Sequence, residues 1–95
     1  MKIVWTEPAA IDLEAVYRYI ERDSEFYAQA VISEILQAVE RVGQFPRSGR
    51  VVPETNDKHI REVLVKNYRI IYKLTKTKIS VLTIVHGSRD LYAFR

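Results

Sequence analysis

Hydrophobic and polar positions along the chain form three successive patterns, which predict a strand, then helices, then further strands. A short apolar run at Lys2–Trp5 is typical of a β-strand. From there to residue 42, apolar residues recur every three or four positions, which is the spacing of amphipathic helices. Between residues 60 and 86 apolar and polar residues alternate, which is the period of half-buried strands.

The helical section divides into two helices, each with its own start signal. Thr6-Glu7-Pro8 predicts the first N-terminus, because threonine caps free backbone N–H groups and proline fits the first turn. This helix is expected to end near Arg22-Asp23. Ser24 is the second predicted cap, and Gly43 lies where a helix C-terminus often has a glycine. Two helices joined by so short a link predict an antiparallel hairpin.

The last third of the chain predicts a β-meander. The expected strands are Ile60–Val65, Tyr68–Thr75 and Ile79–His86. Lys66-Asn67 is the first predicted turn, with Asn67 tolerating a positive φ, and residues 75–78 form the second. The stretch 45–53, which contains two prolines and a glycine, is predicted to be an ordered loop.

The element order β-α-α-β-β-β predicts an α+β fold in one domain, residues 1–95, with the first strand joining the meander. One face of the antiparallel sheet is expected to pack on the helix hairpin and the other to face water. The core-facing residues of the middle strand are Tyr68, Ile70, Tyr72 and Leu74. Arg69 and Lys73 then lie on an exposed basic face.

The charge is uneven along the chain, although the net charge is only +3. Residues 1–46 carry four basic and eight acidic side chains, and residues 47–95 carry eleven basic and four acidic, so the halves are −4 and +7. Such asymmetry favours an acidic partner for the second half, either nucleic acid or a protein surface. A solvated basic face without a ligand is the alternative.

Several functional classes are excluded by what the sequence lacks. It has no cysteine, and two histidines, His59 and His86, are too few for a multi-histidine zinc site. It has no phosphate-binding glycine motif and no apolar run of transmembrane length. We therefore expect no metal, no cofactor, no small-molecule substrate and no membrane partner. The N-terminus lacks a signal-peptide pattern, so the expected location is the cytoplasm.

The candidate functional residues are basic side chains of the predicted sheet and a few titratable neighbours. The basic set, expected to converge on a phosphate or a carboxylate, is Arg61, Arg69, Lys73 and Arg89. Glu62, His86 and Tyr92 are the candidates for general acid or base. His86 has an alternative structural role, in which it holds the loop that follows the last strand.

Three segments carry a resemblance to a known family. They are Phe45–Arg50 followed by Pro53-Glu54, the strand–turn–strand Ile60–Tyr72, and the ending Val81–Asp90. Together they resemble the RelE/ParE superfamily of type II toxin–antitoxin toxins, over nearly the whole chain. The resemblance implies the same β-α-α-β-β-β fold. It also implies a growth-inhibiting toxin that is neutralised by an antitoxin wrapped around it.

The superfamily divides by target, and the residues favour one branch. RelE-like members cut mRNA in the ribosome with two lysines, two arginines and a tyrosine, whereas ParE-like members inhibit DNA gyrase and are not nucleases. Arg69 and Arg89 match the two arginine positions. The lysine positions fall on Ile60 and Glu62, and the tyrosine position falls at Arg95, near Tyr92. The His86–Asp90 ending and the proline loop resemble ParE-like members.

The leading hypothesis is therefore a ParE-like toxin that inhibits DNA gyrase. The antitoxin- and target-binding residues expected from the charge pattern are Arg61, Arg69, Lys73, His86 and Arg89. The first alternative is a RelE-like ribosome-dependent mRNA endoribonuclease, in which Arg69 and Arg89 stabilise phosphate charge. The second alternative is a non-toxic remnant that still binds its antitoxin.

Overall fold

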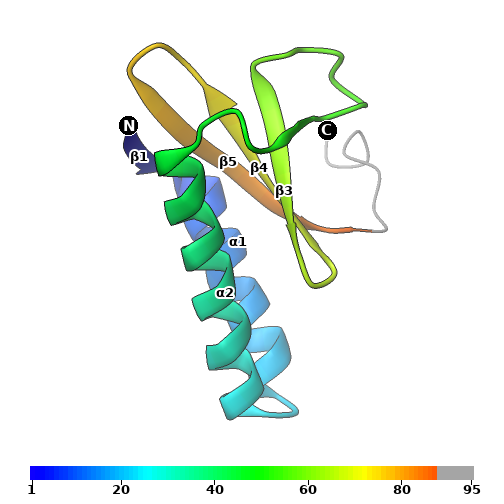
Figure 1. Cartoon of the computed structure of the whole chain (residues 1–95). Coiled ribbons are helices and arrows are strands. Elements are labelled where there is room, and N and C mark those ends of the chain that lie inside the picture. The colour runs from blue at the N-terminus through cyan, green and yellow to red at the C-terminus, as the bar shows by residue number, and fades with distance from the viewer. Residues whose placement is uncertain (88–95) are drawn as a thin grey trace.

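The computed structural model describes residues 1–87, and they form a sheet with two helices packed on one face (Figure 1). The elements are β1 (Lys2–Trp5), α1 (Glu7–Glu21), α2 (Glu25–Gln44), β2 (Arg50–Val51), β3 (Ile60–Val65), β4 (Tyr68–Leu74) and β5 (Lys78–His86). This is the predicted α+β order. The structure has one short strand that was not predicted, β2, which is two residues long and lies inside the stretch predicted to be a loop.

The five strands lie in the order β1-β5-β4-β3-β2. The predicted meander of β3, β4 and β5 is confirmed as a run of antiparallel pairs. β1 joins it by pairing parallel to β5, from Lys2 opposite Lys78 to Trp5 opposite Val81. The sheet is therefore mixed, with the last strand of the chain between the first strand and β4.

Both predicted helix caps are confirmed. Thr6 Oγ1 accepts a hydrogen bond from the Ala9 N–H at 3.3 Å and donates one to the Val81 carbonyl at 2.7 Å. Ser24 Oγ accepts one from the Tyr27 N–H at 3.0 Å. Each cap satisfies one of the free N–H groups of a first helical turn. Thr6 also ties the start of α1 to β5.

α2 ends at Gln44, close to the expected C-terminus, but Gly43 lies inside the helix and does not have the positive φ of a glycine cap. Gly43 is buried, and a Cβ atom added there would lie only 2.7 Å from Ile3 Cδ1. The amino group of Met1 also donates to the Gly43 carbonyl at 3.1 Å. Glycine at this position therefore allows β1 to approach α2 closely, which is a packing role and not a capping one.

The helix hairpin covers one face of the sheet and buries the main core there. The buried residues of this cluster are Ala9, Val16, Val31, Ile35, Ala38, Val39, Val65, Ile70, Val81 and Ile84. Tyr68 packs against it, and Tyr72 and Leu74 form a second cluster with Val42 and Ile79. The predicted inward face of β4 is therefore confirmed.

The expectation that the other face of the sheet is open to water and basic is wrong along most of β4. Ile71 is 1% exposed and packs with Val52 and Val85, and Arg69 is only 5% exposed. Lys73 alone of the three outward residues of β4 is exposed. Much of this face is covered because the chain after β2 folds back onto it, with Val52 bonded through its N–H to the Ile60 carbonyl.

The β3–β4 turn also differs in one detail from the prediction. Lys66 has the positive φ, 53°, and Asn67 does not. Asn67 instead accepts a backbone hydrogen bond from the Gly87 N–H through its carbonyl, which ties the turn to the end of β5.

Candidate functional site

Arg69 lies at the centre of a partly buried group of charges on the face of the sheet away from the helices. Its Nε donates to Glu62 Oε1 at 2.6 Å. Its two terminal nitrogens donate to the two carboxylate oxygens of Glu54, both at 2.8 Å. Arg50 Nε donates to the second oxygen of Glu62 at 2.5 Å. These four side chains, Arg50, Glu54, Glu62 and Arg69, are called the charge cluster below.

The sheet register brings three of these four side chains together. Arg50 in β2 pairs directly with Glu62 in β3. In the next pair of strands Arg69 is opposite Leu64, so it lies on the same face as Glu62 and diagonal to it. A side chain can reach across such a diagonal, and Arg69 is long enough to do so.

Glu54 comes from the turn that follows β2. The Thr55 N–H and hydroxyl both donate to the Val52 carbonyl, at 3.2 and 3.0 Å. Asn56 has a φ of 53°, in the left-handed region that asparagine tolerates. This tight turn places the Glu54 carboxylate over β4, where it meets the guanidinium of Arg69 in a two-point pairing.

As far as residues 1–87 are concerned, the charge cluster is balanced, with two cations and two anions. Glu62 is 1% exposed and Arg69 is 5% exposed, so neither charge is solvated by bulk water. The hydrogen bonds that Arg69 donates to the Glu54 carboxylate raise the pKa of Arg69, which is charged at any physiological pH in any case. Within the described residues, these four paired side chains together carry no net positive charge.

A hollow of about 510 Å³ lies next to the charge cluster. It is lined by Arg50, Pro53, Glu54, Leu64, Lys66, Asn67, Tyr68, Arg69, His86 and Gly87. His86 lies at its edge, exposed, with its ring edge-on to Tyr68 at a centroid distance of 5.8 Å. The structure therefore brings Glu62 and Arg69 together on one face of the sheet. His86 is paired with Tyr68 and so belongs to the face that carries the helices, and it reaches this hollow only at its edge.

The expected convergence of Arg61 and Lys73 with Arg69 is wrong. Arg61 lies on the face of β3 opposite to Glu62. Its guanidinium donates to the carbonyls of Lys58 at 3.1 Å and Gly49 at 2.9 Å. Lys73 lies four residues along β4 from Arg69, which is roughly 13 Å in a strand. Both therefore belong to the other end of the sheet.

The remaining sequence-predicted residues, Arg89 and Tyr92, lie outside the described residues. Among residues 1–87, no group of three or more His, Cys, Asp or Glu side chains is arranged to hold a metal ion. Within the same part of the chain, no helix is long and apolar enough to cross a membrane.

Comparison with known proteins decides the family. The family model described as "ParE toxin of type II toxin-antitoxin system, parDE" matches residues 3–91. The chain belongs to the ParE toxin family. This ParE-family chain is therefore the toxin component of a type II toxin–antitoxin system, and the partner of such a toxin is its cognate antitoxin.

Relatives of this ParE-family toxin cover almost its whole length. A curated protein of Caulobacter vibrioides named "Toxin RelE2" is 30% identical over 89 residues, which is 93% of this chain and 97% of that protein. Y4kP of Sinorhizobium fredii is 31% identical over 91 residues, which is 94% of this chain and 91% of that protein.

A solved structure confirms the fold of this ParE-family toxin. The structure titled "Chromosomal ParDE TA system from P. aeruginosa" superposes with a TM-score of 0.74. The superposition covers 90% of this chain and 95% of that one, at 22% identity. The two chains therefore share the arrangement of two helices on a five-stranded mixed sheet.

Two members of the charge cluster, Arg50 and Glu54, were not among the sequence-predicted site residues of this ParE-family toxin. Both lie in the loop that resembles the family, but the sequence pattern gave no indication that they pair with Glu62 and Arg69. The available signal was Glu62, an acidic residue next to apolar ones in a predicted strand. A carboxylate in such a position needs cations as partners when it is buried.

Proposed function

We propose that this toxin stops growth by binding and inhibiting DNA gyrase, and that it does not cut RNA. The observation that supports this best is the pairing of Arg69 with Glu54 and Glu62. Arg69 is the arginine that the resemblance matches to the catalytic set of RelE-like toxins. In this chain its guanidinium is occupied by carboxylates.

The charges explain why this arrangement disfavours phosphate chemistry. A nuclease of the RelE kind stabilises negative charge that develops on a phosphate, and it needs cations facing that charge. A phosphate that bound Arg69 would have to displace two carboxylates, one of them 1% exposed. Breaking a buried ion pair and leaving one charge unpaired costs about 3–5 kcal/mol, so Arg69 is a poor phosphate ligand.

The two positions matched to the RelE-like lysines support the same proposal. Ile60 packs on the cluster of Val52, Ile71 and Val85, so its side chain contributes to packing. Glu62 is the carboxylate that joins Arg50 to Arg69. Neither position supplies a cation.

A ribosome-dependent endoribonuclease is the second candidate, and the name of the Caulobacter relative favours it. In that mechanism Arg69 and Arg89 would stabilise the phosphate, and Glu62, His86 or Tyr92 would transfer protons. Among the described members of that set, His86 is exposed beside the hollow, whereas Glu62 and Arg69 are bonded to each other.

Two assays on the purified toxin separate the candidates. The first measures supercoiling of relaxed plasmid by DNA gyrase, and the second maps mRNA cleavage on translating ribosomes by primer extension. We expect supercoiling to stop at stoichiometric toxin and the mRNA to stay intact. Discrete cleavage sites together with normal supercoiling would overturn the proposal in favour of the endoribonuclease.

The variant Glu54→Gln gives a sharper comparison, because it weakens the pairing of Arg69 without changing Arg69 itself. If Arg69 only stabilises the fold, gyrase inhibition by this variant should decrease only as far as its folded fraction, measured by circular dichroism, decreases. A gain of ribosome-dependent cleavage would indicate a catalytic Arg69. Glu34→Gln, which alters an exposed pair with Lys66, is the matched control.

Growth after induction tests the remaining alternative, the non-toxic remnant that only binds its antitoxin. We expect growth to stop when the toxin is expressed alone and to recover when the neighbouring antitoxin gene is co-expressed. Unimpaired growth with a folded, antitoxin-binding protein would support the remnant instead. The proposed location is the cytoplasm, where both candidate targets are found.

A further inference from the structure

A second hollow lies at the end of the molecule opposite the turn between the helices. The N-terminus, the C-terminal end of α2 and the β4–β5 turn meet at this end (Figure 1). The hollow has a volume of about 920 Å³. Its lining residues are Met1, Gln44, Phe45, Pro46, Arg47, Ser48, His59, Lys73, Leu74, Thr75 and Lys76, and it is called the cationic cleft below.

The cationic cleft has an apolar part that is open to solvent. Phe45 is 65% exposed and Met1 is 51% exposed, although both are large apolar side chains. Pro46 and the buried Leu74 extend this surface. An exposed aromatic side chain in a hollow is a common anchor point for a partner, since covering it removes apolar surface from water.

The charges around this apolar part are of one sign. Arg47, Lys73 and Lys76 are exposed, and no carboxylate of residues 1–87 lies within 4.0 Å of their nitrogens in an ion pair. No residue of the lining is acidic. The neighbouring Asp57 forms no ion pair with these cations within 4.0 Å. The hydrogen bond from the His59 backbone N–H, at 2.9 Å, lowers the pKa of Asp57, and the charge of Lys73 lowers it further. The cleft therefore differs from the balanced charge cluster, because its cations remain available.

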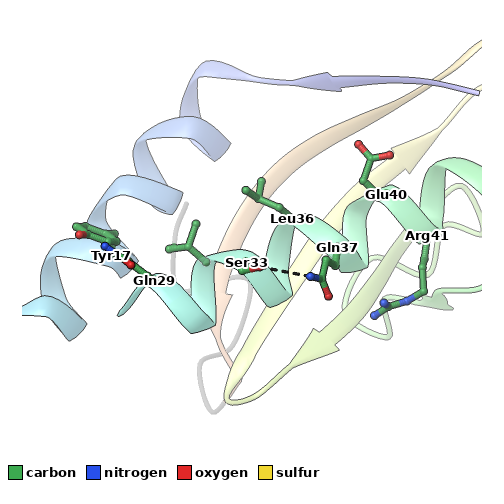
Figure 2. Close-up of a pocket in the computed structure, with 8 residues that line it drawn as sticks. Tyr17, Gln29, Ser33, Leu36, Gln37, Glu40 and Arg41 are labelled. Carbon is green, nitrogen blue, oxygen red and sulfur yellow. Dashed lines mark hydrogen bonds between the residues drawn. The ribbon is translucent and has the colours of Figure 1, made fainter. Parts of the chain in front are cut away.

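The helix hairpin carries a surface of a different kind, shown in Figure 2. There Tyr17 of α1 and Leu36 of α2 line an apolar groove of about 630 Å³, with Glu40 and Arg41 towards one end. Its charged residues are of both signs, so the groove has no electrostatic preference for an anion. On the proposed function the toxin binds two proteins, its antitoxin and its target, and these two hollows differ in chemistry.

We propose that the cationic cleft binds an acidic segment of the protein that this toxin targets. Carboxylates of that segment would pair with Arg47, Lys73 and Lys76, and one of its apolar side chains would cover Phe45. The identification of the partner as the target rests on the proposed function. A single-stranded nucleic acid is the competing occupant, because a base can stack on Phe45. The other apolar lining residues, Met1, Pro46 and Leu74, are aliphatic and match an apolar side chain better than the flat face of a base.

The first test uses a probe that contains no gyrase. Fluorescein-labelled hexapeptides with five Asp or Glu residues and one variable residue, Phe, Leu or Ala, are titrated with the toxin. We expect the Phe and Leu peptides to bind about tenfold more tightly than the Ala peptide, and all affinities to fall as salt is added. An oligodeoxynucleotide of equal charge that binds more tightly than every peptide would overturn the proposal in favour of nucleic acid.

Variants locate this binding. The double substitution Lys73→Glu with Lys76→Glu should reduce peptide affinity by at least about tenfold, because two attractive contacts become repulsive. Phe45→Ala should abolish the preference for Phe over Ala peptides while leaving the salt dependence. Lys66→Glu, at the opposite end of β4, is the matched control and should bind as the parent does. Equal peptide binding by the double variant would place the site elsewhere and refute the proposal.

The second test separates this proposal from the proposed function. We expect the double variant to lose gyrase inhibition by at least about tenfold and to keep its unfolding temperature and its antitoxin complex. If the parent toxin inhibits gyrase and the double variant does so equally well, the cleft proposal fails and the function stands. If the parent does not inhibit gyrase, the function fails, and the peptide titration still decides the cleft. Loss of antitoxin binding alone would assign the cleft to the antitoxin and contradict the proposal.

Discussion

Glu62 contacts Arg69 through one carboxylate oxygen, at 2.6 Å, and Arg50 through the other, at 2.5 Å. One buried side chain thus connects β2, β3 and β4 on the face of the sheet that no helix covers. Arg69 adds Glu54 to this chain of contacts and so holds the 52–57 segment against the sheet. The arginine matched to a catalytic role in the superfamily therefore joins parts of the fold in this toxin.

Replacing Glu62 by glutamine should strongly destabilise the toxin. The amide keeps the size of the side chain but removes its charge, which leaves Arg69 with one anionic partner fewer in a buried position. We expect urea unfolding to show a loss of about 3 kcal/mol. Glu34→Gln, which alters an exposed pair with Lys66, should change stability by less than about 1 kcal/mol. Equal effects of the two substitutions would mean that the charge cluster contributes little.

Gly49→Ala should also destabilise the protein, for a steric reason. An added Cβ would lie 2.5 Å from the Tyr72 hydroxyl oxygen and 2.7 Å from the backbone oxygen of Glu62. The second of these atoms belongs to β3 and cannot move away without disturbing the β2–β3 pair. Overpacking of this kind costs about 1–3 kcal/mol, measurable by thermal or urea unfolding. The neighbouring Ser48→Ala, at an exposed position, should have almost no effect.

The Tyr72 hydroxyl should make stability depend on alkaline pH. It donates to the Pro46 carbonyl at 2.8 Å and accepts from the Gly49 N–H at 3.1 Å, and burial raises its pKa above the usual 10.0. A raised pKa means that the stabilisation is complete below pH 10 and is lost as the pH rises through the pKa of the folded state. The stability advantage over Tyr72→Phe should therefore shrink above pH 10.

Unfolding in urea across the alkaline range measures this effect, with Tyr19→Phe as the control. Tyr19 is 66% exposed, so its substitution should leave the pH dependence of the parent unchanged. If Tyr72→Phe shows the same alkaline loss of stability as the parent, a group other than Tyr72 is responsible.

Asp12 should be important for the attachment of α1 to β5. Its Oδ2 accepts hydrogen bonds from the Thr83 hydroxyl at 2.6 Å and from the Ile84 N–H at 3.0 Å. Asp12→Ala removes the acceptor of both hydrogen bonds and should cost about 1–3 kcal/mol, with faster hydrogen exchange at the Ile84 amide. Glu14→Ala breaks only an exposed pair with Arg18 and should cost less than about 0.5 kcal/mol. An unchanged exchange rate at Ile84 in the Asp12 variant would contradict this prediction.

The parts of the fold that the sequence predicted are those decided by neighbouring residues. Thr6 and Ser24 cap helices by bonding to an N–H three residues later, so their role is visible locally. The inward face of β4 follows from an alternation of apolar and basic residues within seven positions, which only Ile71 interrupts. The packing role of Gly43 cannot be predicted from its neighbours, because the side chain that requires a glycine there, Ile3, is 40 residues away in the sequence.

The candidate site was harder to predict, for the same reason. Arg69 looks like an exposed cation when only its own strand is considered. It is buried because Glu54, 15 residues earlier, reaches it from a turn whose course depends on the left-handed Asn56. The net charge of residues 47–95 can be counted from the sequence alone. Its division into a balanced cluster and an unpaired set around Lys73 and Lys76 depends on tertiary structure.

The parallel pairing of β1 with β5 also determines when the toxin can fold during its synthesis. The first strand and the helix hairpin leave the ribosome early, but the strand that lies beside β1 and packs on α1 is residues 78–86. Contacts so distant in sequence form late, and the apolar faces of the nascent chain stay unpaired until then. A chain released prematurely, before residue 78, would lack the strand that joins β1 to β4. Folding, and with it any activity, would therefore begin only with nearly full-length molecules.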